Sequence, residues 1–178
     1  DWDRELFDEL IPLPEGTSYN AYIVKGSEKT ALIDTVDPPK KADLFRNLKA
    51  AGIEKIDYII SNHAEQDHSG SIPDVLKAFS GSKVVTNEKC AGYLKDFGLL
   101  KDGEYIAVKD GDTISLGNRT LEFVFTPWTH WPETMGTFLR EDKIYFPCDL
   151  FGTHNSPSDI YDTDGVILSA KRLSLIHI

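Results

Sequence analysis

The chain has 178 residues, of which 40% are hydrophobic and 27% are charged, and its formal net charge is −10. This length allows one domain with a sizeable core and is too short for two ordinary domains. The acidic charge argues against binding to nucleic acid or to an anionic membrane, and the sequence has neither a run long enough to span a bilayer nor a signal-peptide pattern. The two cysteines, Cys90 and Cys148, do not indicate a disulfide framework, so we expect a cytoplasmic protein.

Apolar and alternating segments, separated by turn residues, predict a series of strands with helices inserted between some of them. We expect strands at residues 17–24, 29–34, 56–61, 83–86, 105–108, 113–116, 120–125, 137–140 and 143–146. We expect one helix that begins at Pro38 and ends at Gly52, a short helix at 72–79, and a third from the N-cap Asn87 to about Phe97. Strands outnumber helices, which indicates a mixed α/β or α+β layer fold.

The densest group of possible metal ligands follows directly on the apolar strand predicted at 56–61. Residues 62–70 contain His63, Glu65, Asp67 and His68. A strand end that leads into such a loop is where α/β proteins commonly carry their chemistry. Imidazole suits zinc and iron whereas carboxylates suit harder cations, so the mixed set indicates transition metals, and two of them. The alternative is a solvated loop that holds two of the five histidines by coincidence.

Two later segments repeat this arrangement. His130 follows the strand predicted at 120–125, and Asp149 follows the strand predicted at 143–146. Taken alone, His130 between two tryptophans is typical of a packed structural histidine, and Asp149 is typical of a turn or cap residue. Three strand ends that each deliver a ligand favour a shared metal site instead.

The order of these residues resembles the metallo-β-lactamase superfamily. Its hydrolases have the pattern H-x-H-x-D-H, whereas residues 63–68 read H-x-E-x-D-H, with Glu65 at the second ligand position. This difference, together with Trp-Thr-His-Trp-Pro at 128–132 and Cys-Asp-Leu-Phe-Gly at 148–152, resembles the diiron domain of a flavodiiron protein. The resemblance covers almost all of residues 1–172. It implies a metallo-β-lactamase-like αβ/βα four-layer sandwich, with two mixed sheets facing each other and helices outside, incomplete at the C-terminus.

The resemblance also implies a ligand set for two iron ions. The expected ligands are six side chains, His63, Glu65, Asp67, His68, His130 and Asp149. Asp149 would bridge both metals, Asp67 and His68 would hold one of them, and the other three side chains would hold the second. In some members of the family the residue at the position of His68 does not contact metal. A carboxylate in place of an imidazole adds negative charge and a hard donor, which favours a ferric state and disfavours a pure zinc site.

As a function, the resemblance implies reduction of dioxygen to water, of nitric oxide to nitrous oxide, or of both. Electrons would arrive from FMN, itself reduced by rubredoxin or a similar carrier, and the FMN of one subunit would face the diiron site of the other in a head-to-tail homodimer. The family's final histidine ligand and its flavodoxin-like FMN domain are not in this sequence, so we expect the complete catalyst to be a longer parent protein and the fragment alone to be inactive. The main alternative is a zinc-dependent hydrolase whose nucleophile is a metal-bound hydroxide. A third is a metal-binding domain without enzymatic activity.

Five other residues receive weaker assignments. Asp34 matches a superfamily position that hydrogen-bonds the metal loop, but a strand-end cap is the equal alternative. Cys148 is expected to pack as a small apolar residue. Trp128 and Trp131 either shield the metals from water or belong to the core, and His154 is expected in a surface loop.

The end of the sequence does not continue the domain pattern. A helix-like stretch at 167–172 is followed by residues 173–178, which resemble the translation of a sequencing adaptor. We therefore expect residues 1–172 to be the diiron domain and residues 173–178 to be a non-native tail, so His177 is given no role.

Overall fold

The computed structural model describes residues 4–7 and 9–156. The helix-like stretch at 167–172 and the tail at 173–178 lie outside the described residues. The chain divides into two compact units, one formed by Asp1–Ser18 with Asp149–Ile178 and the other by Tyr19–Cys148.

The larger unit contains a five-stranded sheet. Its order is β3-β4-β5-β6-β7, with β3 antiparallel to β4 and the other neighbours parallel. The strands are β3 (Tyr22–Lys25), β4 (Thr30–Ile33), β5 (Tyr58–Ile60), β6 (Lys83–Asn87) and β7 (Tyr105–Val108). Since β4 to β7 run in one direction, their carboxyl ends meet at one edge of the sheet.

A second, four-stranded sheet is antiparallel throughout and has the order β11-β10-β9-β8. Its strands are β8 (Thr113–Ser115), β9 (Thr120–Phe125), β10 (Met135–Leu139) and β11 (Ile144–Phe146). The predicted hairpin of the last two strands is confirmed, with Leu139 paired to Ile144 next to the turn.

The helices follow strands of the five-stranded sheet. They are the 3-10 helix η1 (Pro38–Lys40), α1 (Lys41–Ala50), α2 (Gln66–Ser69), α3 (Ile72–Ala78) and α4 (Glu88–Asp96). Among the described residues, no helix combines the length and the apolar character that crossing a membrane requires.

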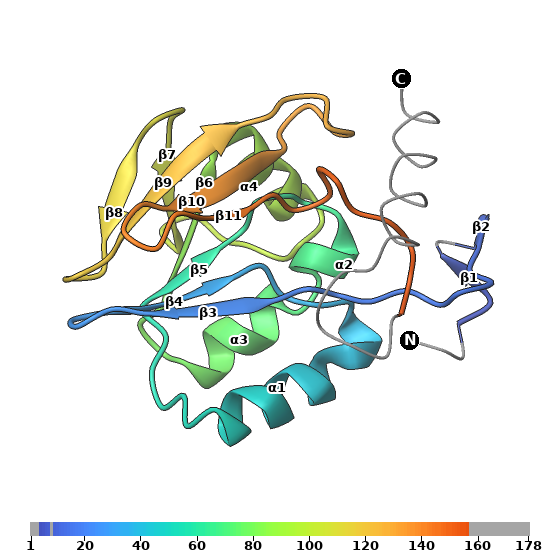
Figure 1. Cartoon of the computed structure of the whole chain (residues 1–178), viewed down its shortest axis with the longest axis horizontal. Helices are drawn as coiled ribbons and strands as arrows, with labels where there is room; N and C mark the ends of the chain where they lie inside the picture. The colour runs from blue at the N-terminus through green and yellow to red at the C-terminus, as the bar shows by residue number, and fades with distance from the viewer. Residues whose placement is uncertain (1–3, 8, 157–178) are drawn as a thin grey trace. The chain divides into compact units, whose positions relative to one another are not determined.

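Alternate residues of the five-stranded sheet build two different core layers. Leu32, Ile59 and Val84 pack with apolar residues of α1, α3 and α4. Their neighbours Ile33 and Ile60 point to the other face and pack with the four-stranded sheet. Figure 1 shows α1 and α3 on one side of β3 to β5, and the four-stranded sheet on the other. The described residues thus supply a helix layer and two facing sheets of the expected sandwich.

The strand predicted at 17–24 is wrong over most of its length, because β3 begins only at Tyr22. Tyr22 pairs with Ile33, the last residue of β4. The next residue, Asp34, has φ of +55°, a left-handed conformation that takes the backbone out of the ladder. Residues before Tyr22 therefore have no continuing partner in β4.

The smaller unit has its own short ladder, β1 (Leu6–Phe7) with β2 (Ile11–Pro12). His154 belongs to this unit and is half-buried. Its Nδ1 lies 3.2 Å from Thr17 Oγ1, and its ring centroid lies 4.9 Å from that of Phe7. His154 therefore lies in a loop, as predicted, but it is half-buried against Phe7 and Thr17 rather than fully exposed.

Candidate metal centre

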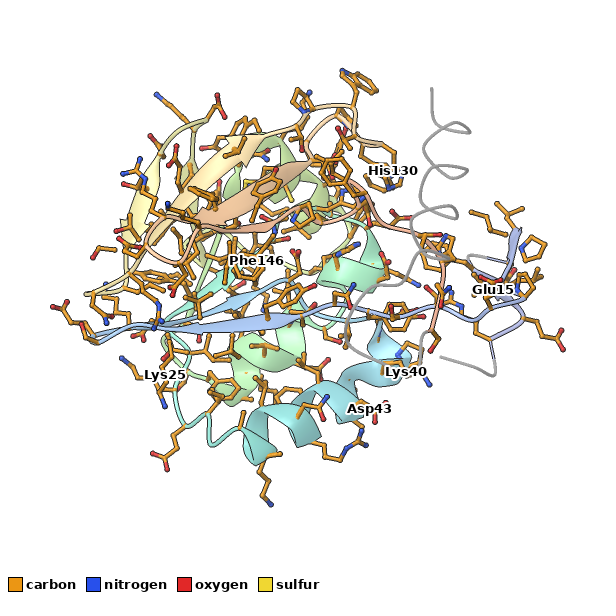
Figure 2. All side chains as sticks on the ribbon, viewed as in Figure 1. Glu15, Lys25, Lys40, Asp43, His130 and Phe146 are labelled. Carbon is orange, nitrogen blue, oxygen red and sulfur yellow. The ribbon has the colours of Figure 1, made fainter. Side chains whose placement is uncertain are left out.

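Several of the predicted ligands meet beyond strand ends of the larger unit. His63 follows β5 by three residues, and His130 lies on the loop between β9 and β10 (Figure 2). Strand β10, which follows that loop, is tied to the segment after β5 by the Met135 amide, which donates to the carbonyl of Asn62 over 2.9 Å. Thr137 Oγ1 adds a bond of 2.7 Å to Asn62 Oδ1. These bonds fix the two ligand-bearing segments to each other.

Glu65 is at the centre of the group. Its Oε2 lies 3.1 Å from His63 Nε2 and 3.0 Å from His130 Nε2. His63 is fully buried, whereas the side chains of Glu65 and His130 are 15% and 27% exposed. Two imidazoles and one carboxylate thus converge on a small region that solvent still reaches from one side.

The Glu65 carboxylate is charged at neutral pH. Burial alone raises the pKa of a carboxyl, but the hydrogen bonds from His130 and His63 outweigh it and lower the pKa of Glu65 to about 2. The group therefore presents a hard anionic oxygen next to two nitrogen donors, a set that suits iron as well as zinc.

The far side of the His63 ring is held by Glu133, a residue that the sequence interpretation missed. Glu133 Oε1 lies 2.7 Å from His63 Nδ1 and accepts a second bond of 3.1 Å from the Ala64 amide. Burial opposes ionisation of Glu133, yet these bonds lower its pKa below the ordinary value. In the sequence, only its position three residues after His130 could have suggested a role for Glu133. No sequence pattern near residue 133 indicates a contact with residue 63.

These contacts test whether a metal fits. With Nδ1 bonded to Glu133, His63 Nε2 faces the charged Glu65 oxygen either as an N–H donor or, once it has lost that proton, as a lone pair. Two electron-rich atoms at 3.1 Å are stable only with a cation between or beside them, either a proton or a metal ion. A metal-ligating histidine usually donates its other nitrogen to a carboxylate in this way. The donor set therefore fits a metal ion.

Helix α2 carries the next two predicted ligands, where the sequence indicated only a loop. The amides of His68 and Ser69 both donate to the Glu65 carbonyl, and Ser69 Oγ donates to the Ala64 carbonyl over 2.7 Å. This turn brings His68 Nε2 to 3.6 Å from Asp67 Oδ2, and its ring to 5.7 Å from that of His63.

Of the two roles considered for Asp34, a hydrogen bond to the metal loop and a strand-end cap, the structure supports the first. Its Oδ1 accepts a 2.8 Å bond from the Asn62 amide and its Oδ2 a 3.1 Å bond from Asn62 Nδ2, directly before His63. Asp149, the sixth predicted ligand, is the first residue of the second segment of the smaller unit, and its carbonyl accepts from the Gly152 amide. Its role in metal binding stays a prediction.

The two tryptophans differ. Trp131 is half-buried, packs against the helix-side core, and lies edge-on to His63 with centroids 5.0 Å apart. Trp128 is 76% exposed, so the core alternative is wrong for it. Cys148 is half-buried and its Sγ lies 3.5 Å from His68 Nδ1. It therefore does not pack as a purely apolar residue.

Residues 17–170 match the sequence family described as "ODP family beta lactamase". The chain belongs to this family. Membership agrees with the arrangement of facing sheets and confirms the metallo-β-lactamase-like fold expected from the ligand pattern.

Two curated relatives are named as oxidoreductases. The chain is 41% identical over 160 residues to a coenzyme F420H2 oxidase of Methanocaldococcus jannaschii, covering 86% of this chain and 38% of that protein. It is 36% identical over 164 residues to a nitric oxide reductase of Moorella thermoacetica, covering 91% and 41%.

Two solved structures are similar throughout. The flavodiiron protein of Giardia intestinalis is 33% identical, with a TM-score of 0.87 over 98% of this chain and 43% of its own. The rubredoxin oxygen:oxidoreductase of Desulfovibrio gigas is 31% identical, with a TM-score of 0.87 over 96% and 44%. The ODP chain thus spans about two fifths of the length of its relatives.

Proposed function

We propose that this ODP chain is the diiron domain of a flavodiiron protein that reduces dioxygen to water, nitric oxide to nitrous oxide, or both. The names of the relatives support this reading: an F420H2 oxidase, a nitric oxide reductase and a rubredoxin oxygen:oxidoreductase. None of these names favours the zinc hydrolase alternative.

The observation that carries the proposal is the position of Glu65. A carboxylate oxygen stands between two imidazole nitrogens, at 3.1 and 3.0 Å, at the ligand position where hydrolases of the superfamily have histidine. An anionic hard donor stabilises ferric iron and makes the site less suited to a metal without redox chemistry.

The proposed ligands of the two irons are His63, Glu65, Asp67, His68, His130 and Asp149. When bound, the iron pair would supply the electrons and the binding positions for the diatomic substrate. The chain's own residues supply the geometry. Glu133 holds the proton on His63 Nδ1 and so presents Nε2, Asp34 fixes the loop through Asn62, and Trp131 covers one edge of His63 against solvent.

The remaining parts of the proposal concern the whole protein. We propose FMN on a flavodoxin-like domain as the electron source, rubredoxin or a similar carrier as its donor, a head-to-tail homodimer, and a cytoplasmic location. The name of the Desulfovibrio gigas relative supports a rubredoxin donor. We also propose that residues 1–172 form the diiron domain and that residues 173–178 are not native.

The test uses the full-length protein, purified without oxygen. We expect two irons per subunit and consumption of dioxygen or nitric oxide driven by reduced FMN. Glu65→His should shift the bound metal from iron toward zinc and abolish turnover, because it recreates the hydrolase ligand set. The exposed Glu54→His, which adds the same imidazole away from the site, is the matched control. Iron content and turnover that Glu65→His leaves unchanged would refute the role of Glu65.

A further inference from the structure

A second group of metal-binding side chains lies beside the Glu65 group, within the larger unit. It consists of Asp34 after β4, His68 on α2 and Cys148 after β11. One ligand atom from each lies within 4.8 Å of the other two. Cys148 Sγ is 3.5 Å from His68 Nδ1, and His68 Nδ1 is 3.9 Å from Asp34 Oδ2.

These separations are close to those of one face of a tetrahedral zinc site. Zinc binds sulfur at about 2.3 Å and nitrogen or oxygen at about 2.0–2.2 Å, so the ligand atoms of a tetrahedral site lie about 3.3–3.6 Å apart. The observed 3.5 Å between sulfur and nitrogen meets this value, and 3.9 Å between nitrogen and oxygen requires only a small rotation of one side chain.

The backbone around the group is already tied in place. The amide and the hydroxyl of Thr35 both donate to the His68 carbonyl over 2.7 Å, which joins the end of β4 to α2. Asp34 is fixed by its two bonds from Asn62 and is only 3% exposed. Little conformational entropy remains to be lost when an ion binds.

Charge and softness select the ion. One carboxylate and one thiolate together balance a divalent cation, and the imidazole adds no charge, so the occupied site is neutral in a largely buried position. Thiolate with imidazole is typical of zinc, whereas the Glu65 group has oxygen and nitrogen donors without sulfur. The two adjacent groups therefore differ in the metals that they prefer.

We propose that Asp34, His68 and Cys148 form a separate site for a soft divalent ion of the zinc type. His68 Nδ1 binds this ion while its Nε2 faces Asp67 at 3.6 Å. An ion bound here fixes the orientation of His68 and links the end of β4 to the segment after β11. The site lies next to the proposed iron centre and takes from the proposed iron ligands only His68, the position that does not contact metal in some members of the family. It does not depend on the proposed reaction.

The test adds one equivalent of Zn²⁺ to the iron-loaded full-length protein and measures X-ray absorption at the zinc edge. We expect one sulfur neighbour at about 2.3 Å with nitrogen and oxygen at about 2.0–2.2 Å, and no release of iron. In Cys148→Ser the sulfur neighbour should disappear. Loss of a residue that only hydrogen-bonds a metal ligand weakens metal affinity about 10–100-fold. Loss of the Cys148 sulfur, a direct ligand, should therefore weaken zinc binding at least about tenfold.

Cys90 is the matched control, since it is the other cysteine of the chain and is buried in the helix-side core. Cys90→Ala should keep the sulfur neighbour and the affinity. In the unmutated protein, Zn²⁺ should also protect Cys148 from iodoacetamide, a readout that needs no variant to fold. A zinc shell without sulfur, displacement of iron by zinc, unchanged affinity in Cys148→Ser or unprotected Cys148 would each overturn the proposal.

Discussion

Among single residues, Glu133 has the most direct influence on how His63 presents its free nitrogen. Its carboxylate accepts from both the ring and the Ala64 amide, and it is buried beside a fully buried histidine. Removing it leaves the ring free to rotate and to change tautomer, although no ligand is lost.

Glu133→Ala should therefore weaken iron binding about 10–100-fold, the usual cost of losing such a partner. Glu133→Gln should lose less, because its amide oxygen still accepts from His63 Nδ1. Competition with a calibrated chelator measures both, and the exposed Glu54→Ala serves as control. Equal losses in the two Glu133 variants would mean that the negative charge of Glu133, and not the hydrogen bond that orients the ring, explains the effect.

At the scale of elements, the N-cap residue of α4, Asn87, makes two different hydrogen bonds through its side chain. Asn87 Oδ1 accepts from the Cys90 amide over 3.0 Å and so caps the helix, while Asn87 Nδ2 donates to the Glu133 carbonyl over 2.7 Å. The same side chain therefore starts a helix and holds the loop that follows His130.

Asn87→Ala should lower the free energy of unfolding by about 2 kcal/mol, of which about 1 is the cap and about 1 the buried hydrogen bond. Asn87→Ser should recover about 1 kcal/mol, because a serine caps the helix but cannot reach the Glu133 carbonyl. Urea unfolding of the three proteins separates the two contributions. If serine recovered the whole loss, the bond to Glu133 would contribute nothing to stability.

The starts of β4 and β5 are joined by Asp57. Its Oδ2 accepts from the Thr30 amide over 2.9 Å and its carboxylate also pairs with Lys55. Burial opposes ionisation, but the bonds from Lys55 and Thr30 outweigh it and lower the pKa of Asp57. A carboxyl with a lowered folded pKa stabilises the fold above its unfolded pKa and loses that contribution as the pH falls through the folded value.

Asp57→Asn should therefore be less stable than the unmutated protein at neutral pH, by about 1.5–3 kcal/mol, the contribution of a hydrogen bond to a charged group. The difference should stay constant down to about pH 5 and shrink below about pH 4, where the unmutated carboxyl becomes protonated. Urea midpoints of both proteins across this range are the measurement. If the difference in stability between the two proteins did not change with pH, the charge of Asp57 would contribute nothing and only the changed packing would explain the loss.

Local signals in the sequence predicted the elements that depend on neighbouring residues. The Asn87 cap and the apolar runs at 105–108 and 120–125 gave α4, β7 and β9 nearly to the residue. The turn of α2 was missed because it is held by the Ala64 and Glu65 carbonyls inside a stretch read as a ligand loop.

The candidate site shows the same division. His63, Glu65 and His130 could be proposed from the sequence, because their residue types and their positions after strands are visible there. Glu133 was not predicted, since its partner His63 is 70 positions away. A glutamate after a proline is also common in loops that carry no functional site. The early end of β4 at Asp34 was also invisible, because left-handed backbone at an aspartate follows from its tertiary bonds to Asn62.

For the whole molecule, the proposed ligands tie together segments that are distant along the chain. His63 and Glu65 follow β5, and His130 lies on the loop before β10, so a metal ion bound by all three would join the two sheets at the edge where β5 ends. Closing a loop this long through a metal restricts the unfolded chain, and a buried carboxylate next to a buried histidine needs the added positive charge. Stability of the molecule and metal occupancy should therefore rise and fall together.

Chelation of the metals from the anaerobic full-length protein should lower its melting temperature by about 10 °C for each site that is emptied. Saturation at 1,000 times the dissociation constant is worth about 4 kcal/mol per site, and each kcal/mol shifts the melting of a domain of this size by about 2–4 °C. Fe²⁺ should restore the melting temperature, whereas Mg²⁺, which avoids imidazole, should not. Hydrogen exchange should speed up at residues 62–70 and 126–132, where the ligands lie, and less in β5. An unchanged melting temperature after complete removal of iron would mean that the strand ends are fixed by the Asn62 and Glu133 hydrogen bonds alone.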